Sequence, residues 1–470
     1  MNSSSSIGVA VRDITPAGPV MLAGFGQRVS PSEGVLDPIF AKALWLDAGA
    51  TRLAFITTDL LCIPGPLAEA VTRAAGERFG LAPAEICLTA SHTHSGPAPY
   101  DARDGAPGVA AYVAFLQEAL VDLVAAAQAD SRPALVSVAV GAADLFFNRR
   151  TRGRPNRVDP RLPVISVDDP ETGVTRAVLF GAGCHPVTLG WDNPLVSADF
   201  PGVAQRVIEA ALPGSVALFV NTTEGNVIPI TSPDRDALDP RGYCGGGVAN
   251  TRRMGEALAA AVLAAHSRRP PAEELSLRTA RQTLMLDPNA GALDPGRVAA
   301  DLAENHRILA EFLGDELPRA LPPGPLWSAA SAAVIRLDLD EGEMRRLMIA
   351  CCRCLGLTAR LARPGSPRPV SVPLEVISVN GFDLLTLPGE VLVEVGDAWT
   401  EIAGHDQAFV VGLANGHLRY LPLAAHHAEP DADLRYETVT AGLAPGGVDT
   451  ALSAASEMLA RLRDARLSEL

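Results

Sequence analysis

Hydrophobic and polar residues follow two patterns along the chain, and the two alternate. Short runs rich in β-branched residues, about five residues long, predict strands. They lie at Ile7–Val11, Ala43–Asp47, Leu53–Thr57, Glu85–Leu88, Leu135–Val140, Val164–Val167, Ala177–Phe180, Val216–Val220, Glu375–Val379, Leu384–Leu387 and Ala408–Gly412. Longer amphipathic segments predict helices at Pro66–Phe79, Val109–Ala129, Val203–Ala211, Thr251–His266, Val298–Leu313, Glu343–Leu355, Val391–Ile402 and Thr450–Arg463. This alternation predicts an α/β fold, a mixed layered sheet with helices on its faces.

Segments rich in proline and glycine interrupt the pattern at Ser267–Pro271, Leu286–Gly296, Leu317–Pro325 and Arg363–Pro369. The middle breaks bracket a helical stretch at residues 286–330, which we interpret as a cap or subdomain within one domain spanning 1–470. No internal repeat is evident in the sequence.

Composition excludes several classes of protein. The 39 basic and 54 acidic side chains leave a net charge of −15, and only 5% of the residues are aromatic. Binding to nucleic acid requires a basic face, so we expect no nucleic-acid partner. Lys42 is the only lysine and follows no glycine-rich loop. Pyridoxal and Walker-type chemistry, which require a lysine, are therefore not expected.

Several features suggest the compartment. Residues Met1–Ser6 lack the basic and apolar regions of a signal peptide, and no window holds eighteen uninterrupted apolar residues. The odd total of 7 cysteines includes Cys351, Cys352 and Cys354, which we interpret as reduced core thiols rather than a zinc knuckle. We expect a cytoplasmic protein without stable membrane insertion.

Two histidines follow the strand at Glu85–Leu88, in the segment Ser91-His92-Thr93-His94-Ser95-Gly96-Pro97. A strand that runs into a Gly-Pro turn places both imidazoles at a sheet edge, and ligands of open α/β sheets bind at the carboxyl ends of strands. Hydrogen-bonded loop histidines would give the same pattern, so this segment alone does not identify a site.

Three other strands also lead into polar residues. Ala177–Phe180 leads to His185, and Ala408–Gly412 leads to Tyr420. Leu384–Leu387 leads to Glu390, which would either cap the following helix or ligate a metal. Two histidines, a carboxylate and a further oxygen donor form a suitable ligand set for a hydrolytic zinc ion with room for water.

The order and spacing of these motifs resemble the catalytic domain of neutral/alkaline (non-lysosomal) ceramidases and ceramidase-like hydrolases over most of the chain. The shared motifs are Val11–Pro16, Thr58–Leu60, Ser91–Pro97, Asn148-Arg149, Cys184–Pro186, Ser197–Asp199, Asn250–Arg252, Leu387–Glu390, Tyr420–Pro422 and Tyr436-Glu437.

The resemblance implies an amide hydrolase with one zinc ion held by His92, His185, Glu390 and Tyr420. It further implies that His94 and Arg149 lie near the reacting carbonyl and that Tyr436 donates a hydrogen bond to the oxyanion. Such a donor contributes about 3 kcal/mol to transition-state stabilisation.

The chain departs from that family in two ways. The Gly-Asp-x-Ser-Pro motif, whose serine has been assigned a catalytic role, is here Gly225–Pro229 with Ile228 at the serine position. Isoleucine cannot act as a nucleophile, so a zinc-water mechanism remains and a serine-acyl mechanism does not. We also expect no C-terminal β-sandwich domain and no export signal, and therefore a smaller, soluble amide substrate.

Other polar residues receive a structural interpretation. We interpret one group as part of a solvated acidic loop, namely His426, His427, Glu429 and Asp431. We interpret Gly245–Gly247 as a flexible loop. Packing or surface positions are expected for Cys184, His266 and His306. Asp59 is a candidate partner that fixes the tautomer of a zinc histidine. His417 and Arg419 flank Tyr420. Their positions in the sequence are equally compatible with a role in lining the pocket and with an ordinary surface position.

The sequence therefore predicts a zinc-dependent hydrolase that cleaves an N-acyl amide through metal-activated water. An ester or lactone hydrolase with the same zinc site, and a non-catalytic binding protein on this scaffold, remain alternatives. The expected partner is a small-molecule amide. The acyl and amine groups, the hydrolysis of ceramide, a homo-oligomeric state and a lid function for residues 286–330 remain open.

Overall fold

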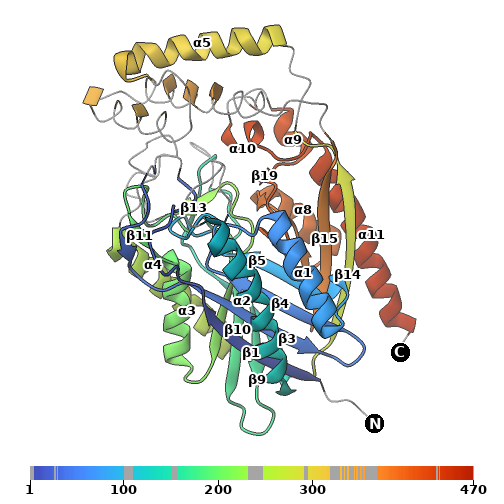
Figure 1. The fold of residues 1–470 in the computed structure, drawn as a ribbon. Coiled ribbons are helices and arrows are strands. Elements are labelled where there is room, and N and C mark those ends of the chain that lie inside the picture. The colour runs from blue at the N-terminus through green and yellow to red at the C-terminus, as the bar shows by residue number, and fades with distance from the viewer. Residues whose placement is uncertain are drawn as a thin grey trace.

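The computed structural model describes residues 5–99, 109–150, 156–230, 247–289, 295–317 and 368–468, without positions 26, 27, 29, 430, 431, 433 and 434, together with single positions between 326 and 354. Within these residues, the longest elements build three sheets of four or five strands. A pair of helices covers the outer face of each sheet (Figure 1).

The three sheets repeat one order of elements, namely three strands, a helix, a strand and a second helix. The first unit is β1 (Ser6–Asp13), β3 (Phe40–Asp47), β4 (Arg52–Thr58), α1 (Gly65–Phe79), β5 (Ile86–Ala90) and α2 (Val109–Ala129). The second is β7 (Leu135–Ala142), β9 (Arg161–Asp168), β10 (Thr175–Ala182), α3 (Asp199–Ala211), β12 (Val216–Asn221) and α4 (Gly247–Ser267). The third is β14 (Leu277–Leu286), β15 (Val370–Val379), β16 (Phe382–Thr386), α8 (Val393–Ala403), β18 (Ala408–Val411) and α11 (Gly447–Ser468).

Pairing within each unit is equivalent. The first three strands pair antiparallel, and the helix then crosses over so that the last strand runs parallel to the third. The parallel pairs are β4 with β5, β10 with β12, and β16 with β18. Because strands that run parallel end at the same edge, each unit offers two chain segments at one edge of its sheet.

Shorter elements connect these units. They are β2 (Gly34–Val35), β6 (Arg132–Pro133), β8 (Phe146–Asn148), β11 (Leu195–Val196), β13 (Val227–Pro229), β17 (Glu390–Val391) and β19 (Tyr420–Leu421), the helices α5 (Pro295–Leu313), α9 (Ala424–His427) and α10 (Tyr436–Val439), and the 3-10 turns η1 (Pro83–Glu85) and η3 (Gly314–Glu316). Helix α5 belongs to a long insertion between β14 and β15 and lies outside the three-sheet body, at the top of Figure 1.

A single core joins the inner faces of the three sheets. Phe55 from β4, Leu179 from β10 and Phe409 from β18 all belong to one buried cluster. Alternate residues of the same strands, such as Ile56, Phe180 and Val410, point outward to the helices. Both faces of these strands are therefore buried, which explains their almost continuous apolar sequences.

Two asparagines join the last strands of the units. Asn221, at the end of β12, donates from Nδ2 to the carbonyls of Ser91 (2.9 Å) and Cys184 (3.1 Å). Asn415 exchanges hydrogen bonds with the backbone of Leu88 in β5, through its own N–H (2.8 Å) and its Oδ1 (3.0 Å). These bonds hold the ends of β5, β12 and β18 together.

The mixed α/β prediction is confirmed, and each of the eleven expected strands coincides with an observed strand. The helices agree as well, except that the expected helix Glu343–Leu355 lies largely outside the described residues. Strand β14 was missed because its half-exposed residues, such as Arg281 and Gln282, lack a clear apolar run, and its pairing with β15 stabilises it. The same order of strands and helices occurs three times in the structure, although the sequence shows no repeat.

Helix α2 is the described helix that is long and apolar enough to cross a membrane, by length and composition. It packs with Leu116, Leu120 and Val124 against the outer face of the first sheet. A core helix passes the same compositional test, and α2 occupies that structural position.

Two compositional predictions can be compared with the structure. Lys42 is buried in β3, where Nζ lies 2.7 Å from both Glu209 Oε1 and the carbonyl oxygen of Ala217, so it has a structural role. Cys351 and Cys354 form no disulfide and are buried in a small cluster around Leu313, which agrees with reduced core thiols; Cys352 lies outside the described residues.

We predict that Asn221→Ala destabilises the fold. The substitution leaves the carbonyl of Ser91 and the backbone N–H of Cys184 without their buried partner. Each unpaired buried group costs about 1–3 kcal/mol, so a loss of several kcal/mol is expected in urea unfolding. The exposed amide of Gln128 on α2 provides the control Gln128→Ala, which should lie within about 0.5 kcal/mol of wild type. Equal midpoints for the two variants would contradict this account.

We also predict a pH dependence from Asp59, directly after β4. Its carboxylate accepts hydrogen bonds from Phe40 N–H (2.9 Å) and Gln205 (3.2 Å), but burial raises its pKa from 3.8 to about 6. The folded state keeps the proton that the unfolded state loses, so this group lowers stability as pH rises from about 4 to 6.

Asp59→Asn removes that proton equilibrium and keeps the shape of the side chain. The variant should be more stable than wild type at pH 8, by as much as about 3 kcal/mol, and should converge with it toward pH 4. Urea unfolding at a series of pH values measures the difference. If the difference in the free energy of unfolding between wild type and variant does not change with pH over this range, the assignment is refuted.

Candidate metal centre

Four segments that follow strands of the three sheets meet at one place. His92 and His94 follow β5, and His185 follows β10. Glu390 begins β17 and Tyr420 begins β19, and these two short strands pair in parallel with Glu390 directly opposite Tyr420. The structure therefore brings together the four residues that the sequence predicted as metal ligands.

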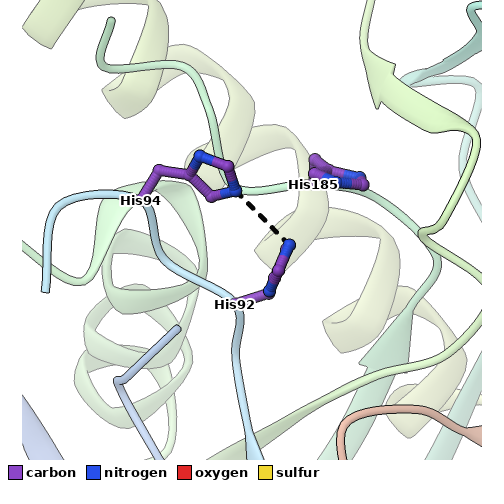
Figure 2. A group of neighbouring side chains, drawn as sticks. All are labelled: His92, His94 and His185. Carbon is purple, nitrogen blue, oxygen red and sulfur yellow. Dashed lines mark hydrogen bonds between the residues drawn. The ribbon is translucent and has the colours of Figure 1, made fainter. Parts of the chain in front are cut away.

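Three buried histidines form the centre of this site. Ligand atoms of His92, His94 and His185 all lie within 4.8 Å of one another. Nε2 of His94 is 3.3 Å from Nε2 of His92, and the ring of His185 lies beside them (Figure 2). Such a group could hold a metal ion.

Backbone carbonyls fix the tautomers of two of these rings. Nδ1 of His92 lies 2.9 Å from the carbonyl oxygen of Leu61, and Nδ1 of His185 lies 2.7 Å from that of Glu224. A carbonyl oxygen only accepts hydrogen bonds, so each Nδ1 carries the proton. Each Nε2 then presents a lone pair toward the centre.

Glu390 adds a carboxylate oxygen to these lone pairs. Its Oε2 lies 3.3 Å from Nε2 of His185 and 3.5 Å from Nε2 of His92, but this buried oxygen has no hydrogen-bond partner among the described residues. Acceptor atoms that converge in a buried place without a donor repel one another unless a cation lies between them. The donor set therefore fits a divalent metal such as zinc, which binds imidazole nitrogen and carboxylate oxygen.

The protonation states suit the same purpose. Burial lowers the pKa of His185 to about 4, and burial together with the neighbouring rings of His92 and His185 lowers that of His94 well below its usual value. Neutral imidazoles and an ionised carboxylate are the forms that ligate metals.

Tyr420 connects the centre to a buried charge network. Its hydroxyl lies 3.4 Å from Nε2 of His185 and 3.1 Å from Nη2 of Arg149. Burial lowers the pKa of Arg149, but Tyr420 and Glu437 outweigh this effect and the pKa is raised. Nε of Arg149 lies 2.9 Å from Oε1 of Glu437. Arg150 also contacts Glu437. Against the desolvating effect of burial, Arg150 and Arg149 lower the pKa of Glu437 to about 2.

The ring of Tyr436 completes this side of the centre. It is half-buried at the start of α10 and meets the ring of Tyr420 edge-on, with 5.5 Å between the centroids. The two other residues predicted near the reacting carbonyl, His94 and Arg149, also lie against the centre.

Tight backbone packing positions His94. Gly24 has φ +94°, and a Cβ there would lie 2.4 Å from Cγ and Nδ1 of the His94 ring. The buried guanidinium of Arg28 donates to the carbonyls of Ala23 and His94 and ties this loop to the histidine segment. His92 itself has φ +70°, an uncommon conformation for a residue other than glycine that often marks functional sites.

An apolar cluster forms the wall beside His94. Phe25 meets the His94 ring edge-on at 4.7 Å and packs with Val187 and Ile228. Phe147, which pairs with Ile228 across β8 and β13, and Trp191 are only partly buried members of this cluster. Ile228, at the position where the resemblance predicts serine, is therefore part of a buried apolar cluster.

The loop before Tyr420 is strained. Leu413, Asn415 and Arg419 have φ values of +55°, +57° and +58°. This left-handed conformation costs roughly 1–2 kcal/mol per non-glycine residue. The sequence left the role of His417 in this loop undecided. In the structure, Nε2 of His417 lies 3.4 Å from Oε1 of Glu390.

Two further residues considered from the sequence have partners away from the centre. The carboxylate of Asp59 contacts Phe40 and Gln205 rather than a histidine, so backbone carbonyls take the tautomer-fixing role considered for it. Cys184 is buried, and burial raises the pKa of its thiol well above the usual value, which agrees with packing.

The remaining histidines lie outside the centre. His426 is buried at α9 and its Nε2 lies 3.5 Å from Oε2 of Glu394, so it is less exposed than the expected solvated loop. His266 is a packed residue with Nδ1 2.8 Å from the hydroxyl of Ser166, and His306 is exposed on α5. Asp431 and the first two glycines of Gly245–Gly247 lie outside the described residues.

No protein-family model matches the chain. The neutral ceramidase of Mycobacterium tuberculosis is 24% identical, over 98% of this chain and 77% of that protein. Neutral ceramidases A and B of Dictyostelium discoideum are 25% and 26% identical, each over 49% of this chain and 36% of the relative.

Solved structures show the same fold. The neutral ceramidase of Pseudomonas aeruginosa superposes with a TM-score of 0.68 at 19% identity, covering 98% of this chain and 75% of that one. A ceramidase structure described as complexed with C2 gives a TM-score of 0.67 at 18% identity, with 98% and 76% coverage. The chain is therefore similar in sequence to neutral ceramidases and has the fold of the solved ceramidase structures.

Proposed function

We propose that this chain is a zinc-dependent hydrolase that cleaves the C–N bond of an N-acyl amide. The observation that carries the proposal is the convergence of two imidazole lone pairs and an unpartnered carboxylate oxygen from His92, His185 and Glu390. Curated relatives that match the chain include neutral ceramidases, which supports amide hydrolysis as the reaction class.

In this proposal His92, His185, Glu390 and Tyr420 hold the metal. A zinc ion bound there would supply a hydroxide nucleophile near neutral pH, because zinc lowers the pKa of a bound water to about 7. Each side chain of the set is buried, so solvent does not compete strongly for these ligand atoms.

The neighbouring residues would act on the substrate. Tyr436 is proposed to donate a hydrogen bond to the oxyanion that forms when the carbonyl carbon becomes tetrahedral. The positive charge of Arg149, held by Glu437 and by the carbonyl of Gly225 (2.9 Å), stabilises negative charge on this side of the centre. We propose that the ring of His94, whose buried Nδ1 has no partner in the described structure, accepts a proton from the attacking water and passes it to the leaving nitrogen.

The proposal includes a substrate that is smaller and more soluble than ceramide. Ile228 offers no hydroxyl and belongs to an apolar wall with Phe25 and Val187. A serine-based route is therefore absent at this position, and a hydroxyl group of the substrate would find no hydrogen-bond partner on Ile228. The net charge of −15 also disfavours approach to anionic membranes.

Metal analysis and hydrolysis by the purified chain test this function. We expect about one zinc per chain, and we expect His185→Ala to lose both the metal and the hydrolysis of an N-acyl amide, because a ligand has been removed. The exposed histidine on α5 provides the control His306→Ala, which should keep both. A zinc-free wild type that still hydrolyses the amide at full rate would overturn the proposal.

The substrate panel for this experiment contains an amide and an ester with the same acyl chain, and a short-chain ceramide. Faster turnover of the simple amide supports the proposal. Turnover of the ester alone would assign an esterase, and bound zinc without any turnover would assign a binding protein.

A second prediction concerns the packing behind His94. Gly24→Ala places a methyl group 2.4 Å from the imidazole at a φ of +94°, so the ring must move. We expect amide hydrolysis to fall at least about tenfold, since small misplacements of reacting groups have effects of this size. Gly18 has open space around it, and Gly18→Ala should retain wild-type rates. Circular dichroism confirms that both variants fold; unchanged rates in folded Gly24→Ala would refute this role.

A further inference from the structure

The two oxygens of the Glu390 carboxylate have different surroundings. Oε2 faces the Nε2 atoms of His185 and His92, at 3.3 and 3.5 Å. Oε1 faces the other way and lies 3.4 Å from Nε2 of His417. A fourth histidine, outside the predicted ligand set, therefore contacts the oxygen that faces away from the metal centre.

Backbone hydrogen bonds hold the His417 loop against the segment that carries Glu390. Leu418 N–H donates to the carbonyl of Pro388 (2.6 Å), and Glu390 N–H donates to the carbonyl of Arg419 (2.8 Å). These two bonds fix the backbone that follows His417 relative to the backbone of Glu390.

The same loop has a conformation that side chains disfavour. Leu413, Asn415 and Arg419, on both sides of His417, have positive φ values. Gly389 allows the close approach of the two segments, because a Cβ at this residue would lie 2.4 Å from the carbonyl oxygen of Arg419. Strained backbone persists only where the surrounding structure stabilises it, and it concentrates at functional sites.

An imidazole N–H that donates to one carboxylate oxygen restricts the other. It restricts the rotation of the carboxylate group and occupies one lone pair of Oε1, so that Oε2 is the oxygen that faces the centre. Partners of this kind orient metal ligands, and their removal typically costs 10–100-fold in metal affinity or activity.

We propose that His417 is a positioning residue that makes Glu390 a one-oxygen ligand of the metal. The inference rests on the proposed function of the centre and extends it, because His417 reaches the metal only through Glu390. Without His417, Glu390 is free to rotate and to present both oxygens.

Two substitutions and one matched control test this role. His417→Leu removes the donor, and His417→Gln keeps an N–H donor on a side chain of similar reach. His405→Leu is the control, because Nε2 of His405 lies 3.0 Å from Oδ2 of Asp383, a histidine–carboxylate pair of the β16 region outside the centre. Circular dichroism of each variant verifies the fold, and His417→Ala replaces His417→Leu if the latter does not fold.

The readouts are zinc affinity by chelator competition and the visible absorption spectrum of the cobalt-substituted chain. We expect His417→Leu to bind zinc about 10–100-fold more weakly and to change the cobalt spectrum, because a second carboxylate oxygen adds to the coordination. His417→Gln should recover most of the affinity and the wild-type spectrum, and His405→Leu should match wild type in both.

Three outcomes decide the inference. Wild-type affinity and spectrum in folded His417→Leu would overturn it while leaving the proposed function intact. A glutamine variant as impaired as the leucine variant would also overturn it, because the donor would not matter. A wild-type chain that binds neither zinc nor cobalt would overturn both the inference and the proposed metal centre.

Discussion

The structure depends on the shared burial of three sheet faces in one core. Residues from β4, β10 and β18, among them Phe55, Leu179 and Phe409, can leave water only if the three units pack against one another. Each outer face has its own helical layer, so the inner core is what joins the units. Since the parallel strands of each unit end at the same edge, this packing also brings the segments after those strands together.

The metal centre is a consequence of that convergence. No unit could assemble it alone, because the first unit supplies His92 and His94, the second His185, and the third Glu390 and Tyr420. Backbone carbonyls of Leu61 and Glu224 then orient two of the rings. The low dielectric of the interior makes the convergence of unshared acceptor atoms costly without a cation, and it strengthens their interaction with one.

The sequence revealed the ligands better than their environment. His92, His185, Glu390 and Tyr420 each follow a short apolar run, and this local pattern is visible in one dimension. The partners that orient them were not predictable in this way, because a carbonyl such as that of Leu61 is available in every residue. The contact between His417 and Glu390 likewise depends on two segments that only the third sheet brings side by side.

The fold shows the same division. Strands with two buried faces have continuous apolar runs and were predicted, whereas β14 has a half-exposed sequence and depends on its ten-residue pairing with β15. The threefold repeat of units left no sequence signal, because each unit needs only the correct pattern of apolar positions and can use different residues to achieve it.

The buried position of Lys42 has a practical consequence for handling the protein. It is the one lysine of the sequence, and its amino group is enclosed in β3 and paired with Glu209. Reagents that acylate or cross-link lysine side chains therefore find no accessible target among them, and fixation with aldehydes would be inefficient. All the other residues among the 39 lysines and arginines are arginine. Because arginine has a higher pKa than lysine, the surface of the protein keeps its positive charges in alkaline buffers in which lysine side chains become neutral.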